Sequence, residues 1–78
     1  MTSKKSIHLK QYKDLINILI EGRHNAGKTQ LELASQLDKP QSFVSKYENA
    51  ERRLDMLEFI IIAKELNIDL IKIVKKFL

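Results

Sequence analysis

The segment from residue 29 to residue 49, TQLELASQLDKPQSFVSKYEN, constrains the fold more than any other part of the chain. It predicts two short helices joined by a tight turn, because Pro40 disfavours helical geometry at Lys39 and is well placed to begin the second helix. Apolar residues at helical spacing are expected to hold the two helices together: Leu31, Ala34, Leu37, Val44 and Tyr47. The second helix then presents a polar row on its other side, formed by Gln41, Ser42, Ser45 and Lys46.

Upstream of this segment, the apolar residues follow helical steps from Leu9 onward. This first helix is expected to end near His24 or Asn25, because Gly27 offers the left-handed conformation that closes helices. Residues 1–6 are polar with two lysines, and they predict a flexible N-terminal arm.

Two pairs of residues have the spacing of capping boxes and are expected to begin helices: Thr29 with Glu32, and Asp55 with Glu58. The helix over residues 56–66 is apolar nearly all the way round, which predicts burial on more than one side. A fifth helix is expected over about residues 68–78, closed off from the fourth at Asn67. The predicted fold class is therefore all-α, a compact five-helix bundle formed by residues 7–78 as one domain.

Composition excludes several classes of site. The chain of 78 residues has no cysteine and only two isolated histidines, so no disulfide, metal site or cofactor is expected. No glycine-rich phosphate loop and no nucleophile-base pair is recognisable, so an enzyme is not expected. The net charge of +4 favours a polyanion, either nucleic acid or an anionic membrane surface.

The apolar runs are far shorter than the roughly 20 residues that span a bilayer. The N-terminal residues lack the apolar stretch of a secretory signal, so a cytoplasmic protein without membrane attachment is expected. No separate ligand-binding domain is expected in a chain of this length.

The polar row of the second short helix has the chemistry of base recognition. Gln pairs bidentately with adenine, Lys donates to guanine, and Ser serves either base. A solvated helix face is the alternative interpretation, and the helix alone leaves both open.

Several motifs in order resemble the phage-repressor and Cro-like helix-turn-helix family, of the xenobiotic-response-element type, over about residues 12–70. The helix-turn-helix itself spans about residues 29–49, and PQSFVSKYENAERR is similar to a frequent bacterial subgroup. The matching positions are Thr29, Gln30, Leu33, Ala34, Val44, Ser45 and Glu48, with Arg23 upstream and Leu57, Ile61, Ala63, Leu66 and Ile68 downstream.

The resemblance implies roles for individual residues toward double-stranded DNA. Base readout falls on Gln41, Ser42 and Lys46, and phosphate contacts fall on Gln30, Ser45, Arg52 and Arg53, although Ser45 could instead pack locally. Lys28 is expected as a further phosphate contact. Gln30 could instead be an ordinary first-turn residue, and the two arginines could be solvated. Phe43 is a boundary residue that either packs on Tyr47 or touches a thymine methyl.

Two further positions have structural implications. Arg23 and Glu48 resemble the buried ion pair that clamps the first helix to the third in this family. Ala50 stands where relatives have glycine, so either the loop takes another conformation or it stores modest strain.

The predicted function is a sequence-specific transcriptional regulator, a repressor that binds a palindromic operator as a homodimer. Half-site centres about 34–36 Å apart are expected. The last helix supplies the expected dimer surface or else only closes the core, through Leu70, Ile73, Val74, Phe77 and Leu78. The alternative is a protein-interaction module of antitoxin type with the same fold, whose main partner is another protein.

Overall fold

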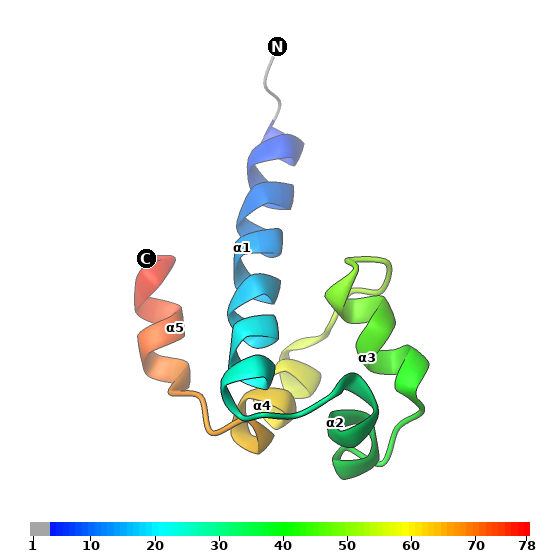
Figure 1. Ribbon diagram of the computed structural model, residues 1–78. Coiled ribbons are helices and arrows are strands. Elements are labelled where there is room, and N and C mark those ends of the chain that lie inside the picture. Colours follow the sequence, from blue (N-terminus) through cyan, green and yellow to red (C-terminus); the bar gives the residue numbers. More distant parts are fainter. Residues whose placement is uncertain (1–3) are drawn as a thin grey trace.

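Five helices make up residues 4–78, the part of the chain that the computed structural model describes, and this part contains no strand (Figure 1). The helices are α1 (Lys4–Asn25), α2 (Gln30–Gln36), α3 (Gln41–Glu48), α4 (Met56–Glu65) and α5 (Leu70–Lys76). The predicted all-α five-helix architecture is confirmed. α1 runs through the middle of the molecule, with α2 and α3 on one side and α5 on the other.

The start of α1 differs from the prediction. The helix begins at Lys4, so residues 4–6 of the predicted flexible arm form its first turn instead. Lysine favours helices and no glycine or proline interrupts the chain between Lys4 and the apolar stripe, so the helix extends upstream of that stripe. Residues 1–3 of the predicted arm lie outside the described residues.

The two predicted capping boxes are both formed. The Glu32 amide donates to the Thr29 hydroxyl at 3.0 Å, and the Thr29 amide donates to the Glu32 carboxylate at 2.9 Å. The corresponding bonds between Asp55 and Glu58 measure 2.7 and 2.9 Å. These bonds satisfy amides that would otherwise lack partners at the starts of α2 and α4.

The first four helices end in the same way, in a Schellman motif. In each, the residue after the cap has a left-handed backbone, and its amide donates to the carbonyl three residues earlier. The next amide donates to the carbonyl five residues earlier. All of these bonds measure 2.9–3.1 Å. The left-handed residues and their φ angles are Gly27 (69°), Asp38 (58°), Ala50 (60°) and Asn67 (57°). The sequence predicts helix ends at Gly27 and Asn67, and both are confirmed. Ala50 adopts the left-handed conformation that glycine has in relatives. Of the two alternatives for this loop, backbone strain at Ala50 is therefore the one that the structure supports.

The core is formed where α1, α2, α3 and α4 meet. Its buried residues are Ile16, Leu19, Leu33, Ala34, Val44, Tyr47, Ile62 and Leu66. Leu31 is not among them. It was predicted to join α2 to α3 but is 60% exposed, because α2 is only seven residues long and turns Leu33 and Ala34 inward instead.

α4 is less buried than its sequence predicts. Ile62 and Ala63 are buried, but Met56, Leu57, Ile60 and Ile61 are exposed, since no element of the described chain covers the outer side of the helix. The segment that follows α4 packs closely against α1. A Cβ added at Gly22 of α1 would lie only 3.1 Å from Cγ1 of Ile68, so the absence of a side chain at Gly22 permits this close approach.

α5 lies along α1 and contributes one buried residue to the fold, Ile73, which is 4% exposed. Ile73 was predicted as a dimer-interface residue, and it is already covered within one chain, so little of its surface is left for a partner. Leu70 is half-buried, whereas Val74, Phe77 and Leu78 remain exposed. The last helix therefore both closes the core and leaves apolar surface open.

Candidate nucleic-acid interface

The two sides of α3 have opposite environments. Val44 and Tyr47 are fully buried against the rest of the domain, which fixes the helix in place. Gln41, Ser42 and Lys46 are exposed on the other side. Among the side chains that the structure describes, those of residues 9–78, none forms a hydrogen bond or ion pair with these three residues, so their polar groups are available to a ligand.

The hydroxyl of Tyr47 is the buried polar atom of this region. Burial raises the pKa of Tyr47, with a further contribution from the negative charge of Glu48, so the phenol stays neutral. Its oxygen has no hydrogen-bond partner among the described residues.

Phe43 lies at the boundary of α3, half-buried and in an edge-on contact with Tyr47 at 5.7 Å between ring centroids. Two cations lie over its ring, the Lys39 ammonium at 5.6 Å and the Arg52 guanidinium at 4.8 Å from the centroid. Lys39 was not among the predicted site residues. Its spacing of four from Phe43 is the sequence signal that could have indicated the contact.

The Arg23–Glu48 ion pair is formed between α1 and α3. Arg23 Nε donates to Glu48 Oε2 at 2.7 Å and Nη2 donates to Oε1 at 3.1 Å. The bond to Glu48 raises the pKa of Arg23, so the guanidinium stays charged. Glu48 Oε1 also accepts a hydrogen bond from Gln30 Nε2 at 2.9 Å, a contact that the sequence did not indicate.

The basic residues predicted to reach phosphates are engaged with other parts of the protein. Lys28 Nζ lies 3.5 Å from Glu65 Oε2, and Arg52 makes a two-bond ion pair with Glu58 at 2.9 and 3.0 Å. The Arg53 guanidinium lies 4.5 Å from the ring centroid of Tyr12. Any phosphate contact of Lys28 and Arg52 therefore competes with a carboxylate.

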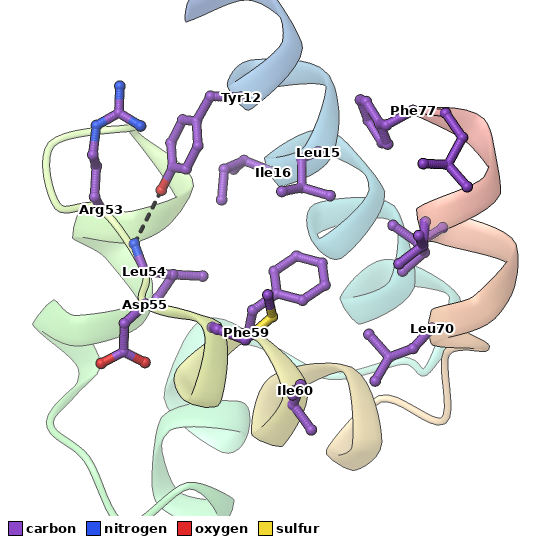
Figure 2. A pocket seen from close by; sticks show the side chains of 14 residues that line it. Tyr12, Leu15, Ile16, Arg53, Leu54, Asp55, Phe59, Ile60, Leu70 and Phe77 are labelled. Carbon is purple, nitrogen blue, oxygen red and sulfur yellow. Dashed lines mark hydrogen bonds between the residues drawn. The ribbon is translucent and has the colours of Figure 1, made fainter. Parts of the chain in front are cut away.

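A second surface is a groove lined by apolar side chains. α1, the loop before α4, α4 and α5 enclose an apolar groove of about 570 Å³. Figure 2 shows Leu15, Phe59, Leu70 and Phe77 facing this space from three helices, and the hydrogen bond from the Leu54 amide to the Tyr12 hydroxyl at 3.2 Å. Among the exposed residues at the groove are Met56, Ile60, Val74, Phe77 and Leu78.

Other kinds of site have no basis in the described residues. Among the described side chains, no group of three histidine, aspartate or glutamate residues is arranged to hold a metal ion. Over the same residues, no helix has both the length and the apolar character required to cross a bilayer.

The chain is similar to known helix-turn-helix proteins over the region that contains α2 and α3. The model of a helix-turn-helix family matches residues 19–73, from the buried part of α1 into α5. Among solved structures, an XRE-family like protein from Pseudomonas syringae pv. tomato str. DC3000 is 49% identical with a TM-score of 0.86. That match covers 92% of this chain and 88% of the other. No curated protein sequence matches the chain significantly.

Proposed function

Since the chain belongs to the Cro/C1-type helix-turn-helix family of DNA-binding transcription regulators, we propose that it is a repressor that reads a palindromic operator as a homodimer. The observation that carries this proposal is the two-sided α3, whose exposed polar side is held rigidly by a buried apolar side. As a regulator of transcription, it would act in the cytoplasm, on chromosomal or phage DNA.

Base readout in the major groove would come from Gln41, Ser42 and Lys46. Their side chains are exposed near one another along α3, and a recognition helix meets base edges with such a row. Gln41 would pair with adenine and Lys46 with guanine. Phe43 would touch a thymine methyl, in competition with the two cations that lie over its ring.

Register on the duplex would come from phosphate contacts of Lys28, Gln30, Ser45, Arg52 and Arg53. Ser45 is half-buried on α3, next to the reading side. The three basic residues would exchange their present partners for phosphates, and this exchange makes the affinity depend on salt through counterion release.

The dimer surface would be the apolar groove and its exposed rim. Monomers rarely leave contiguous apolar patches of more than several hundred Å² open, and a standard interface buries about 800 Å² per partner. Val74, Phe77 and Leu78 keep the role predicted for them, and Met56 and Ile60 of α4 extend the surface. Leu70 would contribute only its open part.

Selection of binding sites from random duplex DNA tests the readout. We expect a palindrome with half-site centres about 34–36 Å apart. Gln41→Ala should relax one base position in each half-site by about 1–3 kcal/mol. Gln11→Ala, which changes an exposed glutamine on α1, is the matched control and should leave the selected sequence unchanged. Failure of folded protein to enrich any sequence at low salt would overturn the proposal.

Sedimentation tests the dimer separately from the readout. Val74→Lys places a charge in the groove and should give monomers, whereas Ile71→Lys, on the same helix but outside the groove lining, should not. Reporter transcription with the selected operator placed over a promoter then distinguishes repression from activation.

The same groove favours one second candidate, an interaction module of antitoxin type in which another protein occupies the groove. In that case the protein would sediment as a monomer at micromolar concentration, and Val74→Lys would abolish binding of that protein without changing the mass of the free chain.

A further inference from the structure

The carboxylate of Glu48 is shared between two neighbouring helices. Arg23 of α1 donates to both of its oxygens, and Gln30 of α2 donates to Oε1 from Nε2. The Glu48 side chain is only 6% exposed. The last residue of α3 is therefore bonded to the first residue of α2 through a nearly buried group.

This contact determines how the Gln30 carboxamide is oriented. A carboxylate has acceptors only, so the nitrogen of the amide must face Glu48 and the amide cannot rotate to present its oxygen. One N–H is used by Glu48, and the second N–H is left for another acceptor. A phosphate oxygen also accepts only, so this second N–H is the group of Gln30 that can bond to DNA.

The backbone before Gln30 is held by the same cation. Arg23 Nη1 donates to the carbonyl of Lys28 at 2.9 Å, two residues before the start of α2. Arg23 therefore supports the backbone before α2, whereas the direction of the Gln30 amide is set by Glu48.

We propose that Glu48 is a positioning residue for DNA binding, which fixes the Gln30 carboxamide with an N–H directed at a backbone phosphate. This inference rests on the proposed phosphate contact of Gln30. A Glu48 with a purely structural role would change stability alone. A positioning Glu48 also changes the contribution of Gln30 to DNA affinity.

A double-mutant cycle with Glu48→Gln and Gln30→Ala tests the proposal. A mixed-sequence duplex serves as the probe, because phosphate contacts do not depend on sequence. Gln30→Ala should weaken binding about tenfold, as expected for a hydrogen bond to a charged group. It should leave the salt dependence unchanged, because glutamine releases no counterion. The amide that Glu48→Gln introduces both donates and accepts, so Gln30 is free to turn over, and Gln30→Ala should cause a smaller loss of affinity in this background than in the unaltered protein.

Arg23→Lys is the matched control. It weakens the same ion pair and should lower the unfolding midpoint, yet Glu48 still accepts from Gln30. Gln30→Ala should therefore keep its full effect on DNA affinity in the Arg23→Lys protein. Equal loss of the Gln30 effect in both backgrounds would assign Glu48 a purely structural role and overturn the proposal.

Nuclear magnetic resonance of the Gln30 side-chain amide keeps the proposal testable if Glu48→Gln does not fold. In the unaltered protein one amide proton should be protected from exchange before DNA is added, and the second should become protected on addition of the duplex. Equal exchange of the two protons in the free protein would overturn the positioning role. If Gln30→Ala leaves affinity unchanged, the proposed phosphate contact is wrong and the positioning role falls with it. Full additivity of the two substitutions would overturn the positioning role alone.

Discussion

Replacing Ala50 by glycine should stabilise the protein, and replacing Gly27 by alanine should destabilise it. Both residues are the left-handed residue of a Schellman motif, with φ angles of 60° and 69°. A left-handed conformation brings Cβ too close to the following carbonyl, at about 1–2 kcal/mol for a residue with a side chain. Glycine avoids this strain because it has no Cβ.

The net gain at Ala50 is smaller than the strain itself. Glycine gives the unfolded chain more freedom, which offsets about 0.4–1 kcal/mol. Loss of the half-buried methyl group offsets roughly another 0.4 kcal/mol. Ala50→Gly should therefore raise the free energy of unfolding by about 0.5 kcal/mol. A Cβ at Gly27 would have no neighbour within 4 Å, so packing does not contribute there. Gly27→Ala should lower the free energy of unfolding by about 1 kcal/mol.

Urea unfolding with a thermal scan measures both changes, since about 1 kcal/mol moves Tm by roughly 4–8 °C in a domain of this size. Asn67→Gly is the control, because Asn67 has the same motif and a φ of 57° but asparagine tolerates this conformation. It should change stability less than Ala50→Gly. A lower midpoint for Ala50→Gly would refute the strain argument, and so would a gain at Asn67 equal to the gain at Ala50.

Three further predictions concern buried and paired polar groups. Tyr47→Phe removes a hydroxyl without a partner and should stabilise the protein by about 1 kcal/mol in urea unfolding; a loss of stability would contradict this. Glu58→Gln keeps a residue that can form the capping box but removes the charge that holds Arg52. DNA binding at low salt, measured by fluorescence titration, should therefore become tighter. Weaker binding would contradict the competition between Glu58 and phosphate. Hydrogen bonds of Thr29 lower the pKa of Glu32, and those of Arg52 and then Asp55 lower the pKa of Glu58. Their contribution to stability should be present above the ordinary glutamate pKa of about 4.3 and lost as pH falls through the lower folded-state values, measured by urea unfolding at stepped pH.

The parts of the fold that depend on nearby residues could be predicted from the sequence. The two capping boxes satisfy amides within one helical turn, in the pairs Thr29 with Glu32 and Asp55 with Glu58. Helices also end within a few residues of Gly27 and Asn67. All of these interactions join residues that are close in the sequence, so the local sequence is sufficient to predict them. The Arg23–Glu48 pair joins residues 25 positions apart, and only the family resemblance made it predictable.

The remaining features depend on which helix faces another. Leu31 and the outer side of α4 have apolar patterns that predict burial, yet burial requires a covering element, and the described chain supplies none. Ile73 and Val74 are neighbours in α5, and only the placement of α5 beside α1 buries the first and exposes the second. The Lys28–Glu65 ion pair could not be predicted from the sequence either, because several other carboxylates have the charge to pair with Lys28.

The pairing of basic residues bears on how such a small domain distinguishes DNA sites. An arginine or lysine that is bonded to a surface carboxylate gains little free energy from that bond, because exposed pairs are weak. The bond nevertheless lowers the net gain when the cation moves to a phosphate, as Arg52 would on leaving Glu58. Phosphate contacts contribute equally at every sequence, so carboxylate competition weakens non-specific binding more than it weakens base readout. Lys46 has no such carboxylate within the described chain. The arrangement therefore favours the residues proposed to read bases over those proposed only to hold the backbone.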